Sequence, residues 1–228
     1  MKLLIAIIAI AGTIITYNLM KKIYIKFFTP FMVPILTTTV VIAGVLLFFQ
    51  IPYETYMVGG KWIVHLLGPA VVALAYPLYN QLDTIKKYGT PIIAGVFCGT
   101  IIGIVSGIEL SILFKIEKIT TYSLVPKSVT SPVAMDIASV IGGNPTLAAV
   151  FVMVAGVFGA VFGPYLIKWI RINHFIGKGI GFGTAAHGIG TSKALELGER
   201  EGAISSIAMT LSTIFASVLS PVFVYLLL

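Results

Sequence analysis

Five stretches of this chain are apolar over lengths that match the hydrocarbon core of a lipid bilayer, which about 20 helical residues cross. They run from Leu3 to Leu19, Phe31 to Phe49, Ile92 to Phe114, Thr146 to Ile170 and Ala203 to Leu228. Of the 228 residues, 58% are hydrophobic and 10% charged, whereas soluble domains carry about 25% charged residues. The sequence therefore predicts an all-α, polytopic integral membrane protein, placed as a multi-pass protein in the cytoplasmic membrane.

The basic charges are distributed as in membrane proteins. The 15 Lys and Arg residues outnumber the 8 Asp and Glu residues, and they stand singly or in pairs between the apolar runs, as Lys86 and Lys87 do. This pattern is typical of cytoplasmic loops, whereas a nucleic-acid-binding protein gathers its cations on one face. We therefore expect the lipid bilayer, and no nucleic acid, as the partner of this charge.

Three further stretches are apolar but interrupted, namely Trp62 to Tyr79, Val125 to Gly143 and Ile176 to Leu195. The residues that break the helices are Gly68, Pro69 and Pro77 in the first stretch and Pro126 and Pro132 in the second. The third stretch holds six glycines in the fourteen residues from Gly177 to Gly190. Irregular backbone at membrane depth must face protein or a cavity, so the sequence predicts broken, re-entrant helices within the bundle.

A weak internal repeat follows from these breaks. Pro77 precedes Ile92 by as many residues as Pro132 precedes Leu147, and each proline leads through a polar turn into a glycine-rich span. We expect one membrane domain over 1–228, made of N-terminal scaffold helices (1–56), two broken-helix units (57–114 and 118–172), and a glycine-rich broken helix with the C-terminal helix (174–228). Paired broken segments are typical of secondary transporters. The sequence leaves open whether the repeats are inverted.

Glycines recur every four residues on one face of the third long span, at Gly95, Gly99, Gly103 and Gly107. Small residues at this spacing let neighbouring helices approach closely. We therefore favour packing within the bundle over contact with a solute for these glycines, and homo-oligomerisation is a further expectation.

Three motifs in order resemble the LrgB/CidB family. They are LGPAVVALAYPLY (67–79), PKSVTSPVAM (126–135) and GTAAHGIGTSKALELG (183–198). The C-terminal part of the plant plastid glycolate/glycerate translocator resembles the same family. The resemblance implies two functions, the first being holin-like or antiholin-like regulation of murein hydrolase export and autolysis with a small LrgA/CidA-type membrane partner. The second is transport of small monocarboxylates such as pyruvate, glycolate or glycerate.

The sequence bears on this choice. A simple holin needs two or three self-associating helices, without broken helices or charges inside the membrane, whereas this chain has both features. We therefore rank a carrier above a pore-forming protein, and an accessory subunit of a two-component transporter is the third possibility.

The second broken stretch offers an anion site. Lys127 supplies a cation, the hydroxyls of Ser128, Thr130 and Ser131 supply donors, and Pro132 opens a half-helix whose free amides attract a carboxylate. In the alternative interpretation, Lys127 extends to the membrane interface and the hydroxyls only cap the helix. Asp136 is a candidate coupling residue or a partner of Lys127, and equally a solvated side chain.

The third broken stretch supplies the remaining candidates. His187 titrates near physiological pH and lies in glycine-rich backbone, so it is a candidate for proton coupling as well as for substrate binding; the alternative is a purely structural histidine. Thr184, Gly188, Gly190 and Thr191 surround it in sequence and complete the predicted substrate site.

The sequence contains no pattern that predicts an enzyme. We find no carboxylate pair at acid/base spacing, no nucleophile beside a base and no Cys/His metal cluster. The run from Gly177 to Gly183 superficially resembles a nucleotide-binding loop, but it follows no strand. We therefore expect no catalytic residue, no metal and no cofactor.

Overall fold

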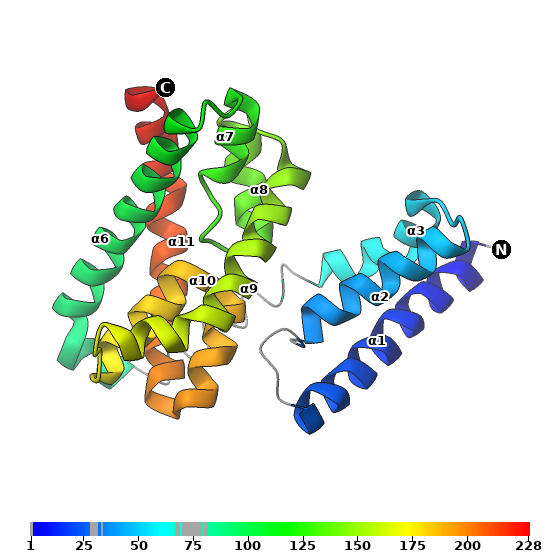
Figure 1. Cartoon of the computed structure of the whole chain (residues 1–228), viewed down its shortest axis with the longest axis horizontal. Helices are drawn as coiled ribbons and strands as arrows, with labels where there is room; N and C mark the ends of the chain where they lie inside the picture. Colours follow the sequence, from blue (N-terminus) through cyan, green and yellow to red (C-terminus); the bar gives the residue numbers. More distant parts are fainter. Residues whose placement is uncertain (1, 28–31, 33, 67–68, 70–78, 80–81) are drawn as a thin grey trace. The chain divides into compact units, whose positions relative to one another are not determined.

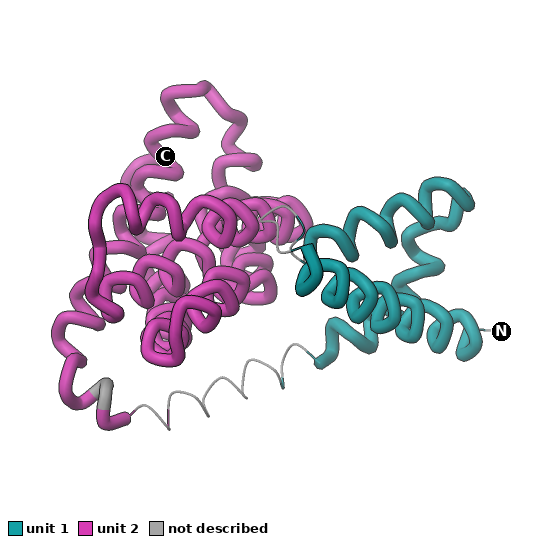
Figure 2. Tube along the Cα trace, turned by 60° about the horizontal axis from the view of Figure 1, so that its bottom comes forward, with its two compact units in different colours: residues 1–73 teal, residues 74–228 magenta. Residues whose placement is uncertain are grey.

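The computed structural model describes residues 2–27, 32, 34–66, 69, 79 and 82–228. Every regular element within these ranges is a helix. The chain divides into two compact units, residues 1–73 and residues 74–228, coloured teal and magenta in Figure 2. The prediction of an all-α membrane protein is confirmed, because four described helices are long and apolar enough to cross a bilayer.

The first unit contains α1 (Lys2–Phe27), α2 (Pro34–Phe48) and α3 (Tyr53–His65). Helix α1 packs against both of the others. A Cβ atom at Gly59 of α3 would lie 2.6 Å from the carbonyl oxygen of Ala6, so only glycine allows these two backbones to approach so closely. A hydrogen bond of 3.0 Å between the hydroxyls of Thr13 and Tyr56 joins the same helices.

Two predictions for the first unit are changed or left open. The span expected from Phe31 to Phe49 is a helix of only 15 residues, about 22 Å long at 1.5 Å per residue, because it begins at Pro34 and the chain turns at Gln50, whose φ is 53°. The break expected at Gly68, Pro69 and Pro77 falls on or beside residues 67–68 and 70–78, which lie outside the described residues.

The second unit is built on three long helices, α6 (Leu82–Leu113), α9 (Pro145–Trp169) and α11 (Glu199–Leu227) (Figure 1). They coincide with the last three spans expected from the sequence. Helix α6 is kinked at Tyr88, where φ is −122°; Pro91 explains the kink, because its ring removes one helical hydrogen bond and clashes with the preceding turn.

The interruption predicted at Pro126 and Pro132 is present and forms a re-entrant hairpin. Helix α7 (Lys118–Leu124) ends before Pro126, and α8 (Ser131–Val140) begins just before Pro132. The chain then returns to the level of the last turn of α7, because the amide of Asn144 donates to Ser123 Oγ at 2.8 Å. We call residues 118–140 the first hairpin. It begins at the end of the unit that holds the C-terminus, where Lys118 Nζ donates to the Leu228 carbonyl at 3.1 Å.

Helix α10 (Phe175–Leu197) forms a second hairpin, because it reverses direction at Ala186 and His187, where the backbone is not helical. The contacts with α11 in chain order are Gly179 with Ile204, Gly183 with Ala208, Gly188 with Met209 and Thr191 with Ser205. The first arm of α10 therefore runs parallel to α11 and the second arm runs antiparallel to it. The sequence predicted irregular backbone here, but the glycines do not form the break: they lie in the arms, where they allow close packing.

The two hairpins start from opposite ends of the unit. Helix α9 follows the first hairpin and leads to the second as one helix of 25 residues, about 37 Å long. The same order, a re-entrant hairpin followed by a spanning helix, thus occurs twice, as α7–α8–α9 and as α10–α11, in inverted orientation. The predicted domain boundaries remain predictions.

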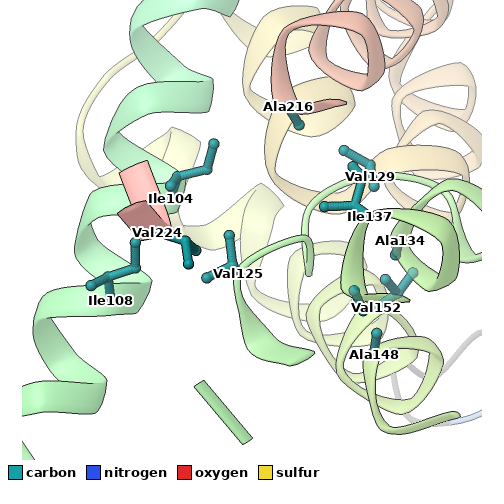
Figure 3. Close-up of a cluster of buried hydrophobic side chains, with 11 residues drawn as sticks. Ile104, Ile108, Val125, Val129, Ala134, Ile137, Ala148, Val152, Ala216 and Val224 are labelled. Carbon is teal, nitrogen blue, oxygen red and sulfur yellow. The ribbon is translucent and has the colours of Figure 1, made fainter. Parts of the chain in front are cut away.

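Two apolar clusters hold the hairpins in place. In the first, Val125 and Val129 of the first hairpin pack with Ile104 of α6, Val152 of α9 and Ala216 of α11 (Figure 3). In the second, at the other end of α6, buried side chains of α6, α10 and α11 pack together; they are Ile92, Val96, Ile176, Ile204, Ile207 and Ala208. Each hairpin is therefore fixed to α6 and α11 by its own core.

Candidate functional site

The glycine face of α6 contacts both hairpins. A Cβ atom at Gly99 would lie 3.0 Å from Thr184 Cγ2 of the second hairpin, and one at Gly103 would lie 3.8 Å from Ser128 Oγ of the first. Gly95 and Gly107 extend these contacts to Ile180 and to Lys127 Nζ, at 3.0 and 2.8 Å. The prediction that these glycines allow close helix packing is confirmed.

The packing also brings the two predicted site segments to one place. Gly99 and Gly103 lie near the middle of the membrane-spanning part of α6, Lys86–Leu113, and are one helical turn apart, about 6 Å along the axis. We call Gly99, Gly103, Lys127, Ser128 and Thr184 the hairpin junction. From the sequence, packing was favoured over contact with a solute for Gly99 and Gly103, and their position beside the predicted site residues follows only from the fold.

Lys127 is directed at α6. Its ammonium Nζ donates to the carbonyl oxygen of Gly103 at 2.8 Å, in the space that Gly107 leaves free. An ammonium group carries three N–H donors, and one of them is used by this bond. The lysine therefore has capacity for an anionic ligand at the level of the junction.

The hydroxyls of the first hairpin do not all cap α8. Thr130 is the N-cap residue by position, but its side chain makes no capping hydrogen bond, and its Oγ1 is buried without a partner. Ser128 and Ser131 are half-buried on either side of it. Since the first amides of a helix have no acceptor within the helix, the start of α8 combines free N–H groups with a free hydroxyl.

Three buried hydroxyls in the described part of the second unit have no hydrogen-bond partner. They are Thr130 Oγ1, Thr184 Oγ1 and Ser220 Oγ. Other buried hydroxyls of this unit have partners: Thr100 donates to the carbonyl of Val96, four residues earlier, at 2.8 Å, and Ser212 Oγ accepts from Thr100 Oγ1 at 3.3 Å. A buried polar group left without a partner costs about 1–3 kcal/mol, so Thr184 at the junction and Thr130, three residues after Lys127, favour a polar ligand there.

Ser220 is not among the site residues predicted from the sequence. This residue is fully buried in α11 and lies on the same helical face as Ala216 and Val224, which pack against the first hairpin. The signal was present in the sequence, because Ser205, Ser212 and Ser220 repeat at intervals of seven and eight residues and so share one face of a helix.

His187 is held by α9 and not by α6. The Nε2 atom of its ring lies 2.9 Å from the carbonyl oxygen of Val152. Because a carbonyl oxygen can only accept a hydrogen bond, Nε2 is the donor. The ring rests against Gly156, where a Cβ atom would lie 2.8 Å from it. The backbone of His187 has φ 40° and ψ −131°, a conformation that costs a non-glycine residue roughly 1–3 kcal/mol. Strain of this kind is concentrated at functional and switch positions.

The other predicted residues of the second hairpin lie at or beside its reversal, where they bond to it or allow its arms to pack closely. Thr191 donates to the His187 carbonyl at 2.9 Å, and its oxygen lies 2.9 Å from Ser205 Oγ. A Cβ atom at Gly190 would lie 2.5 Å from the Phe182 carbonyl, so glycine lets the two arms lie side by side. Gly188 is half-buried beside Met209. Their assignment as binding residues remains a prediction.

Asp136 lies on the exposed face of α8. The ion pairs of the described residues are Lys178–Glu201 at 3.7 Å and Lys193–Glu196 at 2.6 Å, and the structure does not bring Asp136 to Lys127. Its coupling role remains a prediction. Within the described ranges, no group of three His, Cys, Asp or Glu side chains is placed to hold a metal ion.

Comparison with known proteins gives consistent matches over the chain length. The LrgB-like family matches residues 13–226. The uncharacterised protein YxaC of Bacillus subtilis is 48% identical over 222 residues, covering 97% of this chain and 96% of the relative. The holin-like protein CidB is 38% identical in Staphylococcus epidermidis and 36% identical in Staphylococcus aureus, each over 221 residues, covering 97% of this chain and 96% of the relative.

No solved structure matches the chain. The family match and the relatives that align over nearly the whole chain nevertheless agree with the three motifs of the sequence and with the four long apolar helices. The chain is therefore a multi-pass membrane protein that belongs to the LrgB-like family, which includes the holin-like CidB proteins.

Proposed function

We propose that this protein is a secondary carrier that moves a small monocarboxylate across the cytoplasmic membrane, and that the hairpin junction is its binding site. The observation that carries the proposal is Lys127, an ammonium group held at mid-span against α6 with donors to spare. A carboxylate there would bond to Lys127, to Ser128 and to the free amides at the start of α8. Pyruvate, glycolate and glycerate are the solutes that the family resemblance suggests.

The inverted hairpins support a carrier. Broken helices that meet near the middle of the membrane supply the polar groups of solute sites in secondary transporters. We further propose that His187, at the strained reversal of the second hairpin, couples transport to protons. A small LrgA/CidA-type membrane partner and assembly into homo-oligomers belong to the same proposal.

A holin-like or antiholin-like regulator of murein hydrolase export is the second candidate. The names of the CidB relatives favour it and fit it better than monocarboxylate transport. In that case the protein would act with an LrgA/CidA-type partner, and the membrane would become permeable without preference for a solute.

The purified protein in liposomes distinguishes these functions. We expect saturable uptake of labelled pyruvate and glycolate, lost in Lys127→Ala and retained in the matched control Lys115→Ala, since Lys115 is exposed. Passage of labelled sucrose at the same rate as pyruvate would identify a pore and contradict the carrier. Uptake that appears only when an LrgA/CidA-type partner is added would identify a two-component transporter.

Proton coupling has its own test. We expect an inward proton gradient to stimulate uptake in the wild type and to have no effect on His187→Gln, since glutamine can still donate to the Val152 carbonyl but does not titrate. A variant that keeps both its uptake and its response to the gradient would exclude His187 as the coupling residue.

A further inference from the structure

Thr184 is the polar side chain that the second hairpin presents to α6. It is 6% exposed, and its Oγ1 has no hydrogen-bond partner. The side chain packs on Gly99 through its methyl group: from a Cβ placed at Gly99, Cγ2 lies at 3.0 Å, Cβ at 3.7 Å and Oγ1 at 3.9 Å. A threonine inside a helix ordinarily donates to the carbonyl four residues earlier, as Thr191 does. Thr184 does not, so its hydroxyl remains available to a ligand.

The spacing of the glycines along α6 sets the length of ligand that could lie between Thr184 and Lys127. Thr184 lies at the level of Gly99, and Lys127 Nζ lies between the levels of Gly103 and Gly107. These levels are about 6 and 12 Å from Gly99 along the helix axis. Two hydrogen bonds of about 2.8 Å, one at each end, leave about 6 Å or less along the helix axis for the ligand itself. A carboxylic acid of two or three carbons fits this length.

We infer that Thr184 is the specificity-determining residue of this site: its hydroxyl recognises an oxygen on the carbon next to the substrate carboxylate, while Lys127 and the first hairpin hold the carboxylate. The inference rests on the proposed carrier function. Because a hydroxyl both donates and accepts, Thr184 bonds to a 2-hydroxy group or to a 2-oxo group. The site should therefore accept both kinds of acid and discriminate against acids that lack the second oxygen.

Competition against labelled pyruvate uptake in liposomes tests this inference. Propionate and lactate differ only by the 2-hydroxyl group, so the ratio of their inhibition constants measures recognition of that oxygen. We expect lactate to inhibit the wild type about tenfold more strongly than propionate, in line with one hydrogen bond in a buried site. In Thr184→Val the ratio should fall to about one, through weaker inhibition by lactate and unchanged inhibition by propionate.

Two further variants make the test specific. Thr184→Ser keeps the hydroxyl and should keep the ratio, whereas Thr213→Val removes a hydroxyl that already donates to the Met209 carbonyl at 2.8 Å and should leave the ratio unchanged. If Thr184→Val fails to insert into the membrane, Thr184→Ala replaces it.

The outcomes separate the inference from the proposed function. Two outcomes would overturn the role of Thr184 while still supporting a carrier, provided that pyruvate uptake is saturable. Either the ratio of the inhibition constants of propionate and lactate is equal in the wild type and in Thr184→Val, or this ratio is one in the wild type. Absence of saturable carboxylate uptake in the wild type, with or without a partner, would overturn both.

Discussion

A methyl group at Gly107 should disable the site without unfolding the protein. The Cβ atom of Gly107→Ala would lie 2.8 Å from Lys127 Nζ and 4.0 Å from its Cε, with no other atom within 4 Å. The ammonium is the end of a flexible side chain, so it can move away from α6. That movement would separate it from the Gly103 carbonyl, which it now reaches at 2.8 Å.

The effects on stability and on binding should differ in size. Alanine is favoured over glycine in a helix by about 1 kcal/mol, which offsets the cost of moving the lysine, so the melting temperature should change by only a few degrees. A hydrogen bond to a charged group contributes about 1.5–3 kcal/mol. If the displaced ammonium no longer reaches the carboxylate, the KM for uptake should rise by about 10- to 100-fold.

The assay compares two glycines of the same helix. A Cβ atom at Gly89 meets nothing within 4 Å, so Gly89→Ala gains the same helix preference and leaves Lys127 in place. We expect uptake in liposomes to be near wild type for Gly89→Ala and to require far more substrate for Gly107→Ala. Equal KM values for the two variants, with both proteins folded, would refute the assignment of Lys127 as the carboxylate-binding group.

Two further predictions concern the second unit as a whole. Thr191→Val removes the hydroxyl that joins the hairpin reversal to Ser205 and should destabilise the protein in detergent by about 1–3 kcal/mol. The control Ser192→Ala changes an exposed residue and should not destabilise it. Equal melting temperatures of the two variants would contradict the bridging role of Thr191. By the positive-inside rule, the end of the unit with Arg171 should face the cytoplasm and the end with Lys118 should face the outside. In a Cys98→Ala background, Lys118→Cys should therefore react with an impermeant thiol reagent in intact cells, and Arg171→Cys should not. Labelling at position 171 and not at position 118 would show that the unit has the opposite orientation.

The spans and the first hairpin were predictable because they depend on local chemistry. Apolar runs of sufficient length must cross the membrane as helices, and Pro126 and Pro132 cannot lie inside one continuous helix without disrupting it. These constraints act within a few residues of one another, so one sequence is enough to reveal them.

The second hairpin was only partly predictable. The density of glycines correctly indicated irregular backbone, but the reversal lies at Ala186 and His187, while Gly179 and Gly183 remain helical and touch α11. Glycine has two uses, an unusual φ and a close approach, and only the position of the neighbouring helix decides which applies. For the same reason, the assembly of Thr184 with Ser128 on α6 follows from tertiary packing and not from any spacing in the chain.

The arrangement of the hairpins bears on the choice between a carrier and a pore. The two hairpins start from opposite ends of the unit and meet α6 one turn apart, at Gly99 and Gly103. A ligand at the junction is thus covered by the first hairpin toward one side and by the second toward the other. Movement of either hairpin alone would open the site to a single side, as alternating access requires. Conduction without selectivity through this unit would instead require both hairpins to leave α6 together, and so to expose both of their apolar cores at once.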